Sequence, residues 1–177
     1  MAQGTGCAAV RFGVVGSFIS ETVAFESSDT SVVVREMKIL TARGDGLGWI
    51  NIGPGLRDDQ IDRLPAPTVL GRWFSGRGPA VPMATWTPPR GAQAGLPPTI
   101  GVEHGAGPKA LDRLRDAGAP LPDGWRKVQD HAKNGIVAQP AAGASHAEVL
   151  RWLLSACWAL CPIDIEDNWL AEVHQPG

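Results

Sequence analysis

The residues with the clearest chemical potential lie between positions 103 and 108. This segment reads Glu103-His104-Gly105-Ala106-Gly107-Pro108, between an expected strand and an expected helix. Glycines at such a junction let a ligand reach backbone N–H groups, and a helix N-terminus favours an anion. His104 could act there as an acid, a base or an anion ligand, although the spacing matches neither the Walker loop nor the full dinucleotide fingerprint. We therefore predict that His104, Gly105 and Gly107 bind a small anionic ligand, with ordinary helix capping as the alternative.

A second glycine-rich loop lies earlier in the chain. It reads Ser75-Gly76-Arg77-Gly78-Pro79 and repeats the Gly-x-Gly-Pro pattern after an expected strand. The planar guanidinium of Arg77 could hold an anionic ligand or an acidic partner. We include Arg77 among the predicted ligand-binding residues, and the alternative is a solvated loop arginine.

The cysteine and histidine pattern predicts no metal site and no cofactor. Cys157 and Cys161 are four residues apart on the same helical face as several leucines, so we expect them in the core. Cys7 makes the cysteine count odd, which implies no disulfide framework and fits a reducing compartment. Asp130 and His131 could form an acid–base pair, but both also suit the surface of a turn.

The charge balance argues against nucleic acid and membrane partners. The 177 residues include 16 basic and 18 acidic side chains, and no long run of like charges occurs. The N-terminus lacks the features of a signal peptide, and no apolar run approaches about 18 residues. We therefore expect a cytoplasmic protein, and the abundance of Arg, Ala, Gly and Pro is typical of a bacterial genome of high G+C content.

Residues 1–90 are predicted to form an antiparallel β-rich region. Strands are expected at residues 8–15, 31–40, 47–52, 69–74 and 81–86. A hairpin turn is expected at Gly44-Asp45-Gly46, and a short helix over residues 56–64. Residues 91–98, rich in Pro and Gly, are expected to link this region to the rest of the chain, although the two parts could also pack as one domain.

Residues 99–177 are predicted to form a strand–helix–strand–strand–helix–strand unit. The strands are expected at residues 99–103, 125–130, 136–139 and 169–174, with helices over 109–117 and between Ser145 and Pro162. Asn134-Gly135 predicts a tight turn between the middle strands, and Ser145 with Glu148 predicts a helix capping box. This order resembles the split βαβ arrangement of ferredoxin-like folds, so the fold class is expected to be α+β.

The ferredoxin-like resemblance implies the strand order 4-1-3-2 within this unit. His131 and His174 would then lie on opposite edges, about 14 Å apart at about 4.8 Å per strand spacing, which is too far to share a metal. His104 would lie at the other end of the sheet. One face of the sheet would be free of its own helices and would include Leu170.

The seven tryptophans point to a surface for a partner. On the last helix, Trp152 and Trp158 lie on opposite flanks of the apolar stripe, which implies that the helix is covered on more than one side. The cover could be the N-terminal β region or a second chain. Tryptophan is enriched at interface hot spots, so we predict Trp152 and Trp158 as partner-interface residues.

Together these features favour a non-catalytic binding or protein-interaction module. Low charge, abundant tryptophan and the lack of a convergent catalytic set support a partner-neutralising or assembly role, with self-association as one form of it. The alternative is a small-molecule enzyme or sensor that binds an anionic or aromatic ligand near the turn at residues 103–108.

Overall fold

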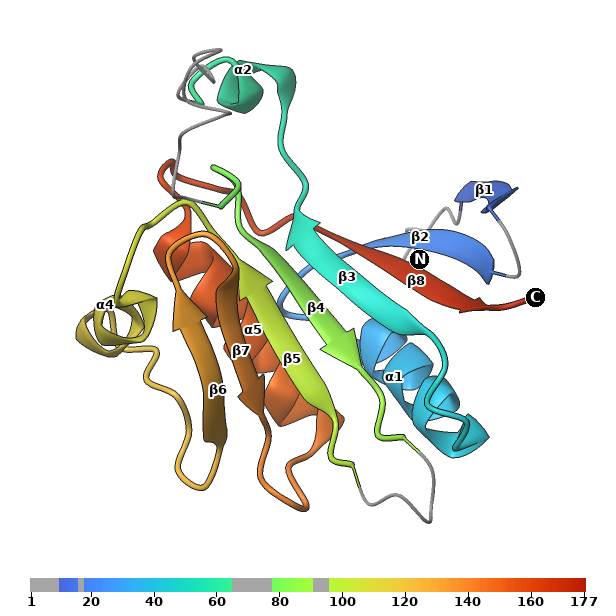
Figure 1. Cartoon of the computed structure of the whole chain (residues 1–177). Coiled ribbons are helices and arrows are strands. Elements are labelled where there is room, and N and C mark those ends of the chain that lie inside the picture. The colour runs from blue at the N-terminus through green and yellow to red at the C-terminus, as the bar shows by residue number, and fades with distance from the viewer. Residues whose placement is uncertain (1–9, 16–17, 65–77, 91–95) are drawn as a thin grey trace, which may run out of the picture.

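The computed structural model describes residues 10–15, 18–64, 78–90 and 96–177. In this part of the chain, eight strands form one sheet in the order β1-β2-β8-β3-β4-β5-β7-β6, and every neighbouring pair is antiparallel (Figure 1). The strands are β1 (Val10–Val15), β2 (Phe18–Phe25), β3 (Trp49–Pro54), β4 (Met83–Thr87), β5 (Thr99–Glu103), β6 (Arg126–His131), β7 (Gly135–Gln139) and β8 (Trp169–Pro176). The expected α+β fold class is confirmed.

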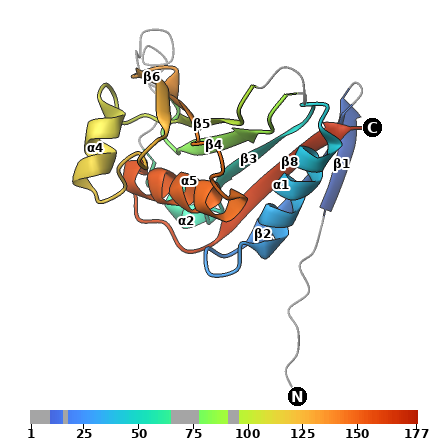
Figure 2. The same ribbon diagram turned by 90° about the horizontal axis from the view of Figure 1, so that it is seen from below.

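The described helices leave one face of the sheet uncovered. They are α1 (Ser31–Arg43), α2 (Asp58–Ile61), α4 (Ala110–Asp116) and α5 (His146–Leu160). Figure 2 shows α1 and α5 side by side under one face of the sheet, and α4 lies beside α5 near β6 and β7. None of these helices is long and apolar enough to cross a membrane. The strands face the viewer in Figure 1, where no described helix lies over them.

The predicted strand over residues 31–40 is wrong, because this segment forms helix α1. Val33, Met37 and Leu40 are its buried residues, and their spacing of four and three is helical. The run of β-branched residues favoured a strand, but the packing of this apolar stripe against α5 and the sheet determines the structure. The expected hairpin turn is likewise the end of this helix, where Gly44 adopts the left-handed conformation at φ 67°.

The ferredoxin-like strand order is not confirmed. Its elements occur in the predicted sequence, and β5, β7 and β6 are neighbours as that order requires. The last strand, however, pairs with β2 and β3 instead of β5. Because α5 passes beneath β5, β4 and β3, it carries the chain two strands beyond the expected position, and β8 is a central strand instead of an edge.

The predicted linker joins two strands of the same sheet. The strands before and after this segment, β4 and β5, are paired from Thr87↔Thr99 to Met83↔Glu103. The residues on either side of the predicted linker therefore belong to one sheet. Strand β2 was not predicted, and α2 covers only part of the helix expected over residues 56–64. The strand expected at 69–74 lies outside the described residues.

Two local predictions in the second half are confirmed. Ser145 caps α5 by accepting a hydrogen bond from the Glu148 N–H at 3.1 Å. A tight turn joins β6 and β7 as predicted, but over residues 132–134, and Gly135, with φ 74°, is the first residue of β7 and pairs with His131. A Cβ at Gly135 would lie 2.3 Å from the Val102 carbonyl oxygen, so this position requires glycine on both grounds.

A pair of adjacent substitutions in α1 tests its helical packing. We expect Leu40→Ala to lower the free energy of unfolding by about 2–5 kcal/mol, because Leu40 is fully buried. Ile39→Ala should cost less than about 1 kcal/mol, because Ile39 is 44% exposed. Urea denaturation of both variants measures this difference. If residues 31–40 formed a strand, Ile39 would lie on the same face as Val33 and Met37. Ile39→Ala would then destabilise the protein more than Leu40→Ala.

Candidate ligand-binding groove

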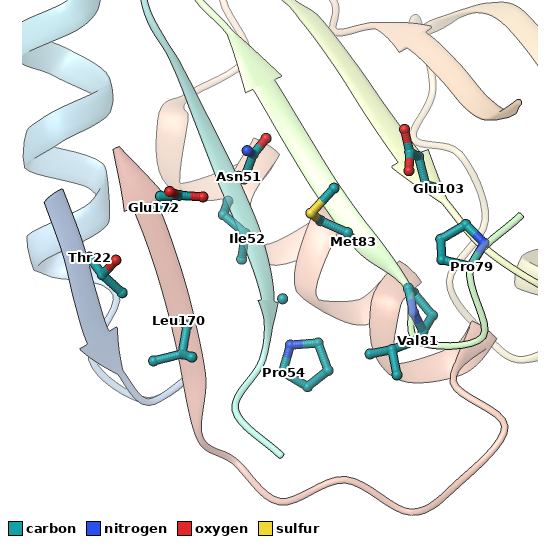
Figure 3. A pocket seen from close by; sticks show the side chains of 12 residues that line it. Thr22, Asn51, Ile52, Pro54, Pro79, Val81, Met83, Glu103, Leu170 and Glu172 are labelled. Atoms are coloured by element: carbon teal, nitrogen blue, oxygen red, sulfur yellow. The ribbon is translucent and has the colours of Figure 1, made fainter. Parts of the chain in front are cut away.

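A groove of about 560 Å³ lies on the uncovered face of the sheet (Figure 3). It crosses β8, β3 and β4 and extends to the segment that leads into β4. Its lining residues are Thr22, Asn51, Ile52, Gly53, Pro54, Pro79, Val81, Pro82, Met83, Glu103, Leu170 and Glu172. A volume of this size suits a small organic ligand, and most of the lining is apolar with a few polar groups, as in most ligand sites.

Gly53 in the groove has no evident requirement for glycine from the fold. A Cβ there would find its nearest neighbour at 3.9 Å, in the Pro82 carbonyl oxygen, and its φ is outside the left-handed region. The register between β3 and β8 runs without a bulge from Trp49 to Pro54. Glycine inside a regular strand often marks a place where another molecule approaches the backbone. The missing side chain therefore leaves room above the sheet.

A row of polar side chains crosses four strands at one end of the groove, and the three on β2, β8 and β3 line it. Thr22, Glu172, Asn51 and Thr85 are successive partners in the register of β2, β8, β3 and β4. The Thr85 hydroxyl donates to Asn51 Oδ1 at 3.0 Å, which directs the Asn51 amide nitrogen towards His174. This row places hydrogen-bonding oxygens beside an otherwise apolar groove.

His174 joins this row to an aromatic cluster. The His174 ring stacks on Trp49, with 4.4 Å between the ring centroids. Phe18 packs against the same Trp49 ring, with 5.2 Å between centroids. His174 Nδ1 lies 2.7 Å from the Ser20 hydroxyl, and Nε2 lies 3.3 Å from both Asn51 Nδ2 and Glu172 Oε2. With a proton only on Nδ1, the ring accepts from Asn51 at Nε2, whereas a ring with a proton on Nε2 donates to Glu172. His174 thus holds both groove residues in place.

Ser20, His174 and Glu172 have the residue types of a nucleophile, a base and an acid. Acyl transfer also needs N–H donors at the position of the developing oxyanion. β2 is paired on both sides, with β1 and β8, so its ladder N–H groups are already used. On the described part of this face, the arrangement supports ligand binding better than acyl transfer.

At the turn predicted to bind an anion, a carboxylate of the chain itself takes up the helix N–H groups. The N–H groups of Ala110 and Leu111, at the start of α4, donate to the two Asp130 carboxylate oxygens at 3.1 and 3.2 Å. The chain therefore caps this helix with its own carboxylate. His131 points elsewhere and accepts from the N–H groups of Lys133 and Asn134, so Asp130 and His131 do not form an acid–base pair.

His104 is fully buried beneath this turn. Neither of its ring nitrogens has a hydrogen-bond partner in the described part of the chain. The pKa of His104 is lowered from the usual 6.5, mainly because burial disfavours the charged ring. The Asp130 charge raises this pKa, and the Arg113 charge lowers it further. Gly105 packs closely on Pro79, where a Cβ would lie 2.9 Å from the carbonyl oxygen, and Gly107 has φ 85°. Arg77 lies outside the described residues.

The two predicted interface tryptophans have different environments. Trp152 is only 6% exposed, packs on Trp125 and donates its indole N–H to the Pro120 carbonyl oxygen at 2.9 Å. Trp158 is 47% exposed and lies 6.2 Å from the buried Trp169 ring. Cys157 is buried in the core as expected, and burial raises the pKa of its thiol to about 12. The described residues contain no group of three His, Cys, Asp or Glu side chains that could hold a metal ion.

Sequence reasoning did not identify the groove, although weak signals of it exist. Asn51 and Gly53 alternate with the buried Ile50 and Ile52, as Leu170, Glu172 and His174 alternate with buried residues in β8. Alternation places each set on one face of its strand. It does not show that β8 lies beside β3, and only that pairing assembles the row.

Comparisons with protein-family models, with curated proteins and with solved structures found no match for this chain.

His104 provides a test of a buried polar group that the fold leaves without a partner. We expect His104→Phe to keep or raise stability, by about 1 kcal/mol, because an unsatisfied buried polar group costs about 1–3 kcal/mol. Its lowered pKa means that the unfolded chain binds a proton first as the pH falls below about 6.5. The wild-type protein should therefore lose stability as the pH falls below this value, and the variant should lose less.

Thermal unfolding between pH 8 and 5 measures both effects. His104→Gln is the control, since it removes the titration and retains a buried polar group. Some acid sensitivity should persist in every variant, because burial and the Lys38 charge also lower the pKa of His146. Strong destabilisation of His104→Phe at pH 8 would show that the imidazole has a structural partner.

Proposed function

We propose that this chain is a non-catalytic binding module that takes its ligand into the groove on the uncovered sheet face. The observation that carries the proposal is Gly53, where the fold leaves an unfilled space in the groove although a side chain would fit the backbone. The surrounding apolar residues favour burial of an apolar group, and Asn51 and Glu172 supply the polar contacts that orient it.

The pairing of the strands favours a compact ligand over an extended peptide. β8 and β4 each pair on both sides, and so does β3 between them, so their ladder N–H and C=O groups are used within the sheet. A peptide lying across this face would bury its own backbone groups against few partners, which is costly. An apolar body with one or two polar groups avoids this cost.

The groove also gives some support to the alternative function, a small-molecule enzyme or sensor near residues 103–108. Glu103 and Pro79 line the groove, and Pro79 packs against the turn at Gly105. An anionic ligand is disfavoured there, however, because the Ala110 and Leu111 N–H groups are bonded to Asp130. We therefore favour binding at the groove over anion binding at the turn.

A side chain added at Gly53, which would occupy the groove, tests the proposal. We expect the purified protein to bind the neutral apolar dye Nile red, and Gly53→Val to weaken that binding at least tenfold because the new side chain would occupy the groove. Fluorescence titration measures the affinity. The variant should fold normally, because valine suits a strand and nothing lies within 3.8 Å of the new Cβ.

Gly101→Val is the matched control. Gly101 is also an inner-strand glycine, and a Cβ there would lie 3.8 Å from its nearest neighbour, the Ile136 carbonyl oxygen. It does not line the groove, so we expect dye binding within about twofold of the wild type. Equal binding by all three proteins would contradict the proposal.

A further inference from the structure

We infer that the groove selects a small organic amine, whose ammonium group is held by Glu172. This inference rests on the proposed function and adds the chemical class of the ligand. It follows from the charge, the position and the partners of the polar residues at the groove.

The described lining of the groove carries negative charge without a compensating positive charge. Glu172 and Glu103 are acidic, and none of the twelve lining residues is basic. Within the described chain, Glu103 forms no ion pair, and His174 Nε2 lies 3.3 Å from Glu172, whose charge it balances only when the imidazole ring is protonated. A carboxylate beside an apolar cavity attracts a cation more strongly than one in bulk water, because the local dielectric is lower.

The row of residues at Glu172 suits an ammonium group. Thr22 and Asn51 are its direct neighbours in the register on either side, and all three line the groove. Thr22 offers a hydroxyl oxygen and Glu172 its two carboxylate oxygens to the N–H donors of a primary ammonium. The Asn51 oxygen is directed to Thr85 on β4, on the other side of β3 from Glu172. Figure 3 shows Glu172, Thr22 and Asn51 around one end, with Leu170, Pro54 and Val81 along the rest.

The second carboxylate is too distant to share one ammonium group. β8 and β5 are separated by β3 and β4, which at about 4.8 Å per spacing places Glu172 and Glu103 about 14 Å apart across the sheet. The register partner of Glu103 on β4 is Met83, whose side chain carries no oxygen. We therefore assign the ammonium group to Glu172 and the apolar part of the ligand to the space above Gly53.

Charge also argues against a second copy of this chain as the occupant. A twofold contact through this face would place the same patch on both partners. The Glu172 and Glu103 carboxylates of one copy would then approach those of the other, and the described lining has no basic side chain to balance them. A cationic small molecule meets the same surface without this repulsion.

Three ligands that share a phenylethyl group and differ in their polar group test the inference: 2-phenylethylamine, 2-phenylethanol and 3-phenylpropionate. We expect the amine to bind the whole chain at neutral pH at least tenfold more tightly than the alcohol, and the carboxylate to bind most weakly. Isothermal titration calorimetry, or competition against Nile red, measures the three affinities. Glu172→Gln should reduce the amine affinity to about that of the alcohol, because it removes a charge-assisted contact.

Glu103→Gln is the matched control, because it removes the same charge from another part of the groove. We expect it to change the amine affinity less than about threefold. Equal losses in both variants would indicate a general negative field and would overturn the assignment to Glu172. Three equal affinities that Gly53→Val abolishes would overturn the amine preference alone, whereas ligands that ignore Gly53→Val would overturn the proposed function as well.

Discussion

The pairing of β8 between β2 and β3 is the interaction on which the rest of this structure depends. It joins the end of the chain to the first half, along Phe18–Phe25 on one side and Trp49–Pro54 on the other. In a central strand, successive side chains point to opposite faces. Trp169, Ala171 and Val173 are therefore buried in the core, whereas Leu170, Glu172 and His174 reach the uncovered face.

Placing the long helices on one side of the sheet gives the two faces different roles. α1 and α5 supply the apolar stripes that bury Ile50, Ile52 and Trp86 almost completely. The other face needs no core residues, so its inner strands can carry glycine, threonine and asparagine. Glycine at position 53 destabilises the strand, because it has no side chain to pack and loses more backbone entropy on folding. A face with a structural role alone would not need this glycine. Room for a ligand is a physical reason for it.

The start of α4 and the uncovered sheet face differ in how far the fold already satisfies their polar groups. At the start of α4, the chain satisfies its own helix with Asp130, which leaves little for an anion to bind. On the uncovered face, Asn51, Ser20 and Glu172 converge on His174, yet Glu172 remains about half exposed at its side chain. The sheet face is therefore the site that we propose for a ligand.

The sequence by itself determined much of the local structure in the second half of the chain. The Asn134-Gly135 turn, the Ser145 cap and the alternation in β8 are each encoded within a few neighbouring residues, so their patterns identify them. The same local reasoning failed at α1, because three successive valines favour a strand and only burial against α5 and the sheet overrides that preference.

Only the tertiary structure decided where β8 lies and which residues share the groove. Thr22, Asn51 and Glu172 are distant in sequence, and their meeting depends on the register of three strands. Strand alternation fixes the face of each side chain but carries no information on its neighbours across the sheet. Those neighbours follow from the path of α5 beneath the sheet, which is a property of how the whole chain packs.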